Sequence, residues 1–203
     1  MRARGSDYFE NSRRATYVQQ QYAIRNPQGF KGYGEYCWGI TTSDGPGPTT
    51  RMIDGVERRF FDYAERGVPY GPDDGTLATW AVVASLPFAP EIVLPTMRYF
   101  NEVYPETTTH YGLKASFNPT YSVEAGNSDF WLCEWCFGIN QGPVVMMIEN
   151  YRSELLWRLM KGCPYLVTGL RRAGFTNGWL ERSSSRAGGD GSTSTREKTS
   201  ARR

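Results

Sequence analysis

The sequence contains a single histidine, His110, among its 203 residues. A zinc site with two histidine ligands is therefore excluded, and a Ser–His–Asp or Cys–His catalytic group would have to use this one residue. The sequence also lacks the Gly-x-x-x-x-Gly-Lys-Ser/Thr and Gly-x-Gly-x-x-Gly patterns of phosphate-binding loops. These absences argue against most metal-dependent, triad-based and nucleotide-dependent chemistry.

Long hydrophobic runs are absent as well. The longest apolar stretch, Leu77–Leu86, is far shorter than the roughly 20 residues that a membrane-spanning helix needs. Residues 1–20 carry four arginines but no apolar core of a secretory signal, so the sequence does not indicate where the protein acts. The formal net charge is only +2, which favours neither nucleic acid nor a membrane surface as a partner.

Cysteine is also scarce, with four residues in the chain. Cys133 and Cys136 have the C-x-x-C spacing of metal and redox sites, but no second pair or histidine accompanies them. We therefore expect buried thiols, with a zinc or redox role as the less favoured alternative.

The chain divides into a body, residues 1–181, and a tail, residues 182–203. The tail has no Leu, Ile, Val, Met or aromatic residue, so it cannot bury enough apolar surface to offset its ordering entropy. It holds six Lys/Arg and two Asp/Glu, a net charge of +4, which leaves the body at −2. We expect a disordered tail and a folded body.

Three helices are expected in the first part of the body. Arg14–Ile24 forms one, which ends at Asn26-Pro27 because a residue before proline avoids helical backbone. A second follows Asp73-Asp74-Gly75, with Thr76 as N-cap, and stops before Pro87. A third begins at Pro90 and runs to about Tyr104, with a kink or a later start caused by Pro95.

The second part of the body predicts two more helices. Pro143–Lys161 has proline at its first position, Gly162 as terminator and one apolar stripe. The members of the stripe are Val144, Ile148, Tyr151, Leu155 and Leu159. A short helix covers about Tyr165–Ala173. With no alternating Val/Ile/Thr pattern or Asn-Gly hairpin detected, the predicted class is mainly α.

Three long loops share a character that suits carbohydrate. They span Asn26–Thr50, Tyr70–Thr76 and Trp131–Pro143, and each places carboxylates or amides beside Trp or Tyr before a helix. Sugar sites combine flat apolar rings with bidentate polar groups, and paired carboxylates serve glycosidic cleavage. The alternative is that the aromatic residues pack, that the Asp-Gly residues form turns, and that Glu149 and Glu154 are solvated.

Several motifs within these segments resemble one family. They are YVQQQYAIRNP at Tyr17–Pro27, GFKGYGE at Gly29–Glu35, WGIT at Trp38–Thr41, DDGT at Asp73–Thr76, SLPFAPE at Ser85–Glu91, GINQGP at Gly138–Pro143 and MIENYR at Met147–Arg152, with Gly169-Leu170 and Gly174-Phe175 after them. Together they resemble the glycoamylase-like domain of bacterial endo-β-1,2-glucanases and cyclic β-1,2-glucan synthases, over about residues 8–176.

The resemblance implies a fold, an activity and a partner. The fold is an (α/α)6 toroid in which helix hairpins surround a central cleft, of which residues 1–181 would supply the C-terminal part. The activity is hydrolysis or transfer at β-1,2-glucosidic bonds, and the partner is a β-glucan or gluco-oligosaccharide. No cofactor or metal is implied. Residues expected to line the cleft are Trp38, Asp44, Asp73, Asp74, Gln141, Glu35 and Glu149.

Position 140 departs from the family. Similar sequences usually read Gly-Ile-Asp-Gln-Gly there, so the resemblance implies a catalytic base at the position of Asn140, and an amide cannot accept that proton. The family's upstream glutamate motif also has no counterpart before Tyr17. We therefore expect glucan binding more than cleavage.

Three alternatives remain open at this point. The chain is a glycoside hydrolase that uses another acidic residue, an inactive glucan-binding remnant, or a non-functional gene fragment. A half-toroid would expose helix faces, so self-association is also expected. The resemblance distinguishes neither an endo-hydrolase from a cyclising transferase nor a retaining from an inverting reaction. Family relatives act in the periplasm or outside the cell, which leaves the location of this chain undecided.

Overall fold

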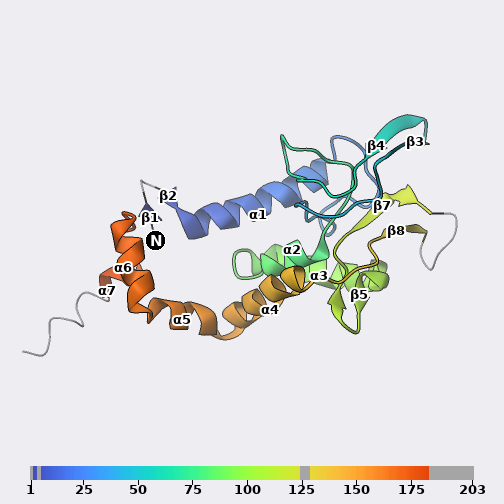
Figure 1. Ribbon diagram of the computed structural model, residues 1–203. Coiled ribbons are helices and arrows are strands. Elements are labelled where there is room, and N and C mark those ends of the chain that lie inside the picture. The colour runs from blue at the N-terminus through green and yellow to red at the C-terminus, as the bar shows by residue number, and fades with distance from the viewer. Residues whose placement is uncertain (1, 4–5, 124–128, 183–203) are drawn as a thin grey trace, which may run out of the picture. The chain divides into compact units, whose positions relative to one another are not determined.

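The computed structural model describes residues 2–3, 6–123 and 129–182 (Figure 1). Apart from Arg182, the predicted tail lies outside the described residues. The chain forms two compact units. The larger comprises residues 9–159, and the smaller is formed by the described parts of residues 1–8 and 160–203.

Helices are the main elements of the described chain. Short strand pairs lie before α1, between α1 and α2, and between α3 and α4. The helices are α1 (Tyr8–Arg25), α2 (Thr79–Ala84), α3 (Pro90–Val103), α4 (Gly138–Ser153), α5 (Leu155–Lys161), α6 (Pro164–Arg172) and α7 (Trp179–Arg182), with a 3-10 turn at Pro105–Thr107. The strands are β1 (Arg2–Ala3), β2 (Ser6–Asp7), β3 (Thr49–Ile53), β4 (Val56–Phe60), β5 (Thr108–Thr109), β6 (Gly112–Leu113), β7 (Phe117–Ser122) and β8 (Phe130–Leu132). The helical character is as predicted, whereas the toroid stays a prediction.

The end of α1 is as predicted, although the helix begins six residues earlier, at Tyr8 rather than Arg14. Asn26 has a left-handed φ of 41° and its N–H still bonds the carbonyl of Tyr22. Its side chain then donates to the carbonyl of Phe30 at 2.8 Å and accepts from the Phe30 N–H at 2.9 Å. These bonds satisfy the polar groups that the helix end leaves open.

The second helix is shorter than predicted, and Thr76 is not its cap. The N-cap of α2 is Ala78, which makes no side-chain capping bond. Thr76 is fully buried instead, and its hydroxyl accepts a hydrogen bond from Asn118 at 3.0 Å. In α3 the helix starts at Pro90 and continues through Pro95, because the lost hydrogen bond falls only one turn from the start.

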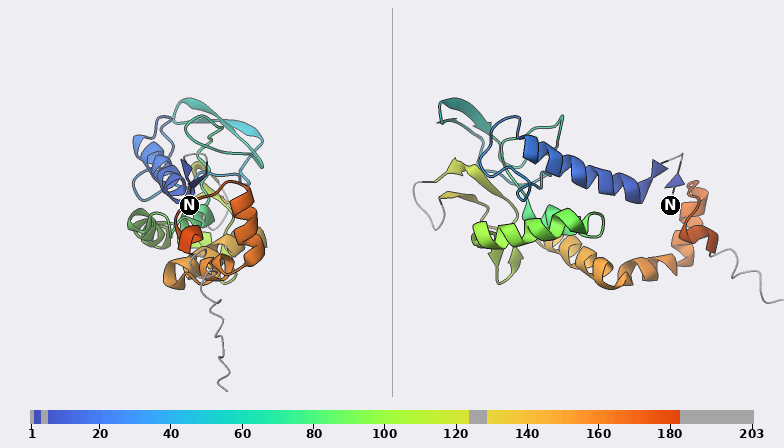
Figure 2. Two further views of the ribbon diagram at one scale, coloured as in Figure 1. Left: turned by 90° about the vertical axis from the view of Figure 1, so that its left-hand side faces the viewer. Right: turned by 180° about the vertical axis from the view of Figure 1, so that it is seen from behind.

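The predicted helix Pro143–Lys161 is two helices. The chain becomes helical five residues earlier, at Gly138, and Pro143 lies inside α4 rather than at its first position. Glu154 then adopts left-handed backbone, with φ 53°. Helix α4 therefore ends at Ser153, and α5 follows as a separate helix (Figure 2). The apolar stripe is accordingly interrupted: Val144 is buried, but Leu155 is 40% and Leu159 is 64% exposed.

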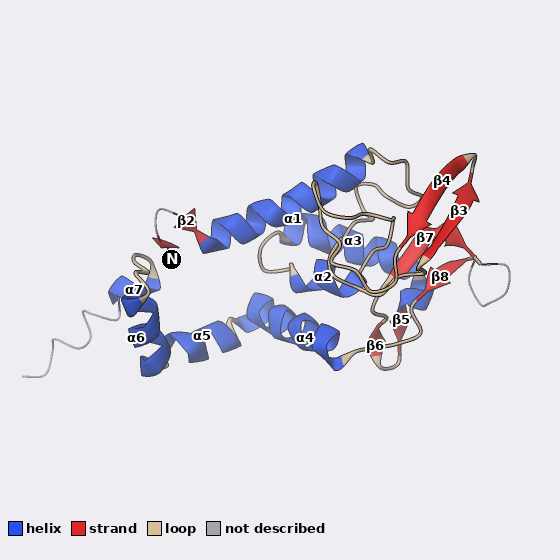
Figure 3. Cartoon of the chain, turned by 45° about the horizontal axis from the view of Figure 1, so that its top comes forward, coloured by secondary structure: helices blue, strands red, loops and turns tan. Residues whose placement is uncertain are grey.

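The structure also contains short sheets, for which the sequence analysis detected no signal. Among the described residues there are four two-stranded antiparallel sheets (Figure 3). The β3–β4 hairpin turns at Asp54-Gly55, where both residues have positive φ, 52° and 78°. Asp-Gly is a favoured type I′ hairpin turn, so the sequence does carry a hairpin signal at this point, although it is not an Asn-Gly pair.

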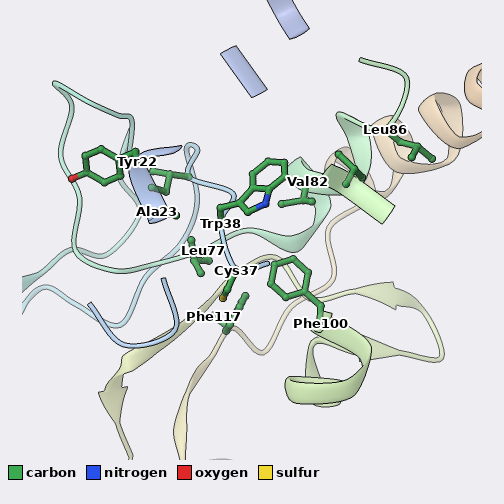
Figure 4. Packing of buried hydrophobic residues seen from close by; sticks show 11 residues of the cluster. Tyr22, Ala23, Cys37, Trp38, Leu77, Val82, Leu86, Phe100 and Phe117 are labelled. Atoms are coloured by element: carbon green, nitrogen blue, oxygen red, sulfur yellow. The ribbon is translucent and has the colours of Figure 1, made fainter. Parts of the chain in front are cut away.

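The core of the larger unit lies where the end of α1, the loop after it, α2, α3 and β7 meet. Figure 4 shows its side chains, among them Tyr22, Ala23, Trp38, Leu77, Val82, Phe100 and Phe117. Helix α2 also packs against α4. The loops that precede α2 and α4 are thereby fixed to one apolar centre, which positions the predicted site residues.

The smaller unit contains α6, close to the predicted Tyr165–Ala173, together with α7 and the β1–β2 pair. The rings of Tyr8 and Phe175 contact each other with centroids 5.2 Å apart, and Arg171 donates to the carbonyl of Leu180 at 3.0 Å. No helix among the described residues has both the length and the apolar character required to cross a membrane.

Candidate functional site

Asp73 lies at the start of the turn before α2, half-buried, and both of its carboxylate oxygens accept hydrogen bonds. One oxygen accepts from the Tyr33 hydroxyl at 2.7 Å and from the Gly75 N–H at 3.1 Å. The other accepts from the Tyr22 hydroxyl at 3.0 Å. Burial raises the pKa of Asp73 above its ordinary value, and the three hydrogen bonds offset this only in part. Asp73 therefore joins α1, the following loop and the turn before α2.

Asp74 faces the opposite way, into the protein, and is 1% exposed. Its two oxygens accept from Nε and Nη2 of Arg66, each at 2.8 Å. The N–H groups of Phe61 and Thr76 complete its shell at 2.9 and 3.1 Å. Burial alone would raise the pKa of Asp74, but hydrogen bonding and charge attraction from Arg66 outweigh it, so the pKa is lowered. These partners enclose the carboxylate of Asp74, and its predicted place at a sugar cleft stays a prediction.

Trp38 is likewise enclosed, with 1% of its surface exposed. Its indole N–H donates to the Thr96 hydroxyl at 2.9 Å, and its ring belongs to the hydrophobic core (Figure 4). Stacking on a sugar requires a free ring face, which Trp38 does not offer. Trp38 therefore packs in the core, and its role toward a glucan stays a prediction.

Asp44 is half-buried and lies close to two other loops. The carbonyl of Asp44 accepts from the Ser116 hydroxyl at 2.7 Å, and the carbonyl of its neighbour Ser43 accepts from Arg66. The pKa of the Cys133 thiol is raised by burial first and also by the negative charge of Asp44. Asp44 therefore lies near the segment that leads to α4, and Arg66 links it to Asp74.

Asn140 and Gln141 occupy the first turn of α4, and the N–H of each donates to the Phe137 carbonyl, at 3.0 and 3.1 Å. Both are half-buried. The Gln141 amide bonds the backbone of Leu113 twice: Nε2 donates to its carbonyl at 2.6 Å, and Oε1 accepts from its N–H at 3.2 Å. Gln141 thus holds hairpin β5–β6 against the start of α4.

Of the two glutamates, Glu35 lies in the loop after α1 and Glu149 lies in the second half of α4. Glu35 is exposed, two residues after Tyr33, and its carbonyl accepts from Gln20 at 3.0 Å. Glu149 is eight residues beyond Gln141 on α4, about 12 Å along the helix axis. The Glu149 carboxylate accepts a hydrogen bond from the Ser153 hydroxyl at 2.5 Å, and its other oxygen lies 3.7 Å from Nη1 of Arg152. Glu149 is thus half-buried and bonded within α4, and its contact with a glucan stays a prediction.

The sequence interpretation missed the residues that hold this group together. Arg66 has no motif around it, yet it is buried and bonds Asp74, Ser43, Phe61 and Asp62. Asn118 donates from its amide to the Asp74 carbonyl and the Thr76 hydroxyl, both at 3.0 Å. Asn118 carries no local signal because these partners lie 44 and 42 residues away. The partners of Arg66 lie 4 to 23 residues away, but no recognised motif contains them.

A pocket of about 250 Å³ lies between α2, α3 and hairpin β5–β6. Polar and apolar side chains line it, including Thr79, Leu94, Met97, Arg98, Asn101 and Leu113. None of the seven predicted contact residues is among its lining residues. Within residues 2–3, 6–123 and 129–182, no group of three or more His, Cys, Asp and Glu side chains is placed to hold a metal ion. All four cysteines are free thiols, of which Cys37 and Cys133 are buried.

A family model described as "Putative glucoamylase" matches residues 2–164. Among individual proteins, an exo β-1,2-glucooligosaccharide sophorohydrolase of Parabacteroides distasonis is 32% identical over 169 residues, covering 82% of this chain. The chain spans only 20% of the length of that relative.

Solved structures show the same relationship. A Bacteroides uniformis protein, described as a "putative glucoamylase", superposes with a TM-score of 0.72 at 38% identity over 88% of this chain. An endo-β-1,2-glucanase of Chitinophaga pinensis, in complex with sophorotriose and glucose, superposes with a TM-score of 0.69 at 30% identity over 88% of this chain. In both cases the chain spans 38% of the other protein.

Proposed function

This chain belongs to the glycoamylase-like family, and from that premise we propose that it binds β-1,2-linked gluco-oligosaccharides. The observation that carries the proposal is its similarity, over most of its length, to a β-1,2-glucanase whose structure holds sophorotriose. The half-buried carboxylates and amides of the loops before α2 and α4 support it, because such groups bond pairs of sugar hydroxyls.

The contacts are proposed residue by residue. Asp44, Asp73, Asn140 and the exposed Glu35 are the groups that would meet sugar hydroxyls. Trp38 and Asp74 would act without touching the sugar, because each is only 1% exposed. Gln141 would do the same, because both polar atoms of its amide bond the backbone of Leu113. Glu149, farther along α4, would contact a different sugar unit. A sugar contact differs from a structural role in that its loss weakens binding without lowering the thermal midpoint.

A ligand-dependent unfolding experiment tests this function. Thermal unfolding is followed with linear β-1,2-gluco-oligosaccharides and, as a control, with cello-oligosaccharides of equal length. We expect a cooperative transition that only the β-1,2 series shifts upward, since a ligand at about 100 times its Kd stabilises by about 2.7 kcal/mol. Equal shifts with both series would contradict the linkage assignment, and a ligand-independent transition would contradict glucan binding.

The chemistry at position 140 leads us to propose binding without cleavage. The Asn140 side chain has no basic group at neutral pH, so it cannot activate a water molecule. We expect the chain to release no new reducing ends from β-1,2-glucan. Release by the wild-type chain that Asp44→Ala abolishes would instead favour a hydrolase using other carboxylates. The variant Asn140→Asp supplies the missing carboxylate and is the direct test of whether position 140 limits catalysis.

Exposed apolar side chains on α4 and α5 also support self-association. Val145 is 65%, Leu155 is 40% and Leu159 is 64% exposed. Leu155 and Leu159 are four residues apart and so lie on one face of α5. We expect the chain to dimerise at micromolar concentration, measured by light scattering. Leu159→Glu should make it monomeric, whereas an unchanged mass for this variant would exclude this face.

A further inference from the structure

The contact between Gln141 and hairpin β5–β6 is unusually complete for one side chain. The amide of Gln141 donates to the Leu113 carbonyl at 2.6 Å and accepts from the Leu113 N–H at 3.2 Å. It therefore pairs with one residue of β6 as a neighbouring strand would. Gln141 satisfies backbone groups at the edge of a two-residue strand that has only β5 as a partner in the described chain.

The backbone of the hairpin is shaped to receive this amide. Gly112 has φ +110°, a conformation that residues with a Cβ rarely adopt, and a Cβ placed there would lie 2.3 Å from Oε1 of Gln141. Glycine at this position therefore both permits the turn and leaves the space that the amide occupies. Hydrogen bonding and steric fit point to the same pairing.

The hairpin is in turn tied to the loop that leads into α4. The hydroxyl of Thr109 donates to the Gly112 carbonyl at 2.9 Å and accepts from the Tyr111 N–H at 3.1 Å. The same hydroxyl lies 3.5 Å from the sulfur of Cys136. The first turn of α4 is thus held from the hairpin side and from the preceding loop.

This arrangement determines the direction of Asn140. Successive side chains on a helix point about 100° apart, because a turn contains 3.6 residues. When Gln141 is fixed on Leu113, the neighbouring Asn140 has a fixed direction as well. We propose that Gln141 is a positioning residue: it orients Asn140 toward the glucan and does not itself bind the sugar. The inference rests on the proposed function, since it assigns Gln141 a role in that same site.

A double-mutant cycle in ligand affinity tests it. The Kd of sophorotriose is measured calorimetrically for the wild-type chain, Gln141→Ala, Asn140→Ala and the double variant. Gln141→Ala should weaken binding about fivefold in the wild-type background, the size of one net hydrogen bond, and by less than about twofold when Asn140 is already alanine. Equal weakening in both backgrounds, or none in the wild-type background, overturns the inference.

Two further variants separate positioning from general loss of structure. Gln141→Glu keeps the size and the acceptor but cannot donate to the Leu113 carbonyl, so it should weaken binding as Gln141→Ala does. Gln21→Ala removes an exposed glutamine from α1 and should leave the Kd unchanged. A Gln141→Glu variant with wild-type affinity and an unchanged thermal midpoint contradicts the inference.

Amide hydrogen exchange at Leu113 gives a readout that does not depend on ligand. Exchange should be faster in Gln141→Ala than in the wild-type chain, because Oε1 no longer accepts that N–H, and unchanged in Gln21→Ala. Unchanged exchange in Gln141→Ala overturns the pairing. If the wild-type chain fails to bind sophorotriose, the proposed function is refuted, and so is the role of Gln141 toward glucan. Binding with an additive cycle overturns the role of Gln141 alone.

Discussion

Arg66 and Asp74 form an ion pair in which neither side chain is exposed. The guanidinium Nη2 lies 2.8 Å from one carboxylate oxygen, and the relative exposure of both side chains is 0%. The remaining donors of Arg66 bond backbone carbonyls of Ser43, Phe61 and Asp62. The pair therefore joins the loop that carries Asp44 to the turn that carries Asp73. Breaking the pair would disturb the positions of both segments.

Removing one member of this pair should strongly destabilise the protein. Arg66→Met leaves Asp74 charged and buried, at an expected cost of about 3–5 kcal/mol in the free energy of unfolding. The matched control is Lys31→Met, which breaks an exposed pair with Asp54 at 3.7 Å and should cost less than about 1 kcal/mol. Urea unfolding measures both. Equal losses of unfolding free energy in the two variants would refute the prediction that the buried ion pair matters more than the exposed one.

The same pair predicts how stability depends on acid. The pKa of Asp74 is lowered in the folded protein from 3.8, so its stabilisation is present above the unfolded pKa and lost as the pH falls through the folded pKa. Stability should decline below about pH 4. In the double variant Arg66→Met/Asp74→Leu this decline should be smaller, measured by thermal unfolding between about pH 2 and 6. A profile identical to that of the wild type would contradict the assignment.

The raised pKa of Asp73 predicts the opposite dependence of stability on pH. Its pKa is raised in the folded protein from 3.8, chiefly by burial. The folded state therefore binds this proton more tightly than the unfolded state, and the associated stabilisation is lost as the pH rises through the folded pKa. Asp73→Asn removes this titration, so its stability relative to the wild type should improve with rising pH. A difference that is constant with pH would show that the pKa of Asp73 is unshifted.

Trp38 should behave as a core residue and not as a sugar contact. Trp38→Phe removes the hydrogen bond to Thr96 and part of a buried ring, at an expected cost of about 1–3 kcal/mol. Thr96→Val removes the same bond from the other side and serves as the matched variant. Both should lower the thermal midpoint while the folded protein keeps its affinity for sophorotriose. A tenfold loss of affinity without a change in midpoint would assign the ring to the sugar.

Two glycines should respond in opposite directions to alanine. Gly55 has φ +78°, and a Cβ added there would meet no atom within 4 Å, so Gly55→Ala should cost about 1 kcal/mol through backbone strain alone. Gly142 lies inside α4 with equally open space, and Gly142→Ala should stabilise by about 0.5–1 kcal/mol. Chemical denaturation of both variants measures the contrast. Destabilisation by Gly142→Ala would contradict the open space beside it.

Local signals accounted for several elements of the fold. The stop of α1 at Asn26-Pro27, the start of α3 at Pro90 and the position of α6 follow from backbone preferences of adjacent residues. The signal for the β3–β4 hairpin is equally local, because the Asp54-Gly55 pair predicts its turn. The division of Pro143–Lys161 was not predictable in this way, because Glu154 adopts left-handed backbone without a glycine to signal it.

The sequence by itself determined the family, the helical character and the segments that carry the polar loops, since these depend on motifs and on neighbouring residues. Only the tertiary structure decided what each side chain does. Trp38 bonds Thr96, 58 residues away, and Gln141 bonds Leu113, 28 residues away. Such pairings decide whether an aromatic ring, a carboxylate or an amide is buried and satisfied or open to a ligand. Burial depends on the whole packed chain, and no local pattern contains it.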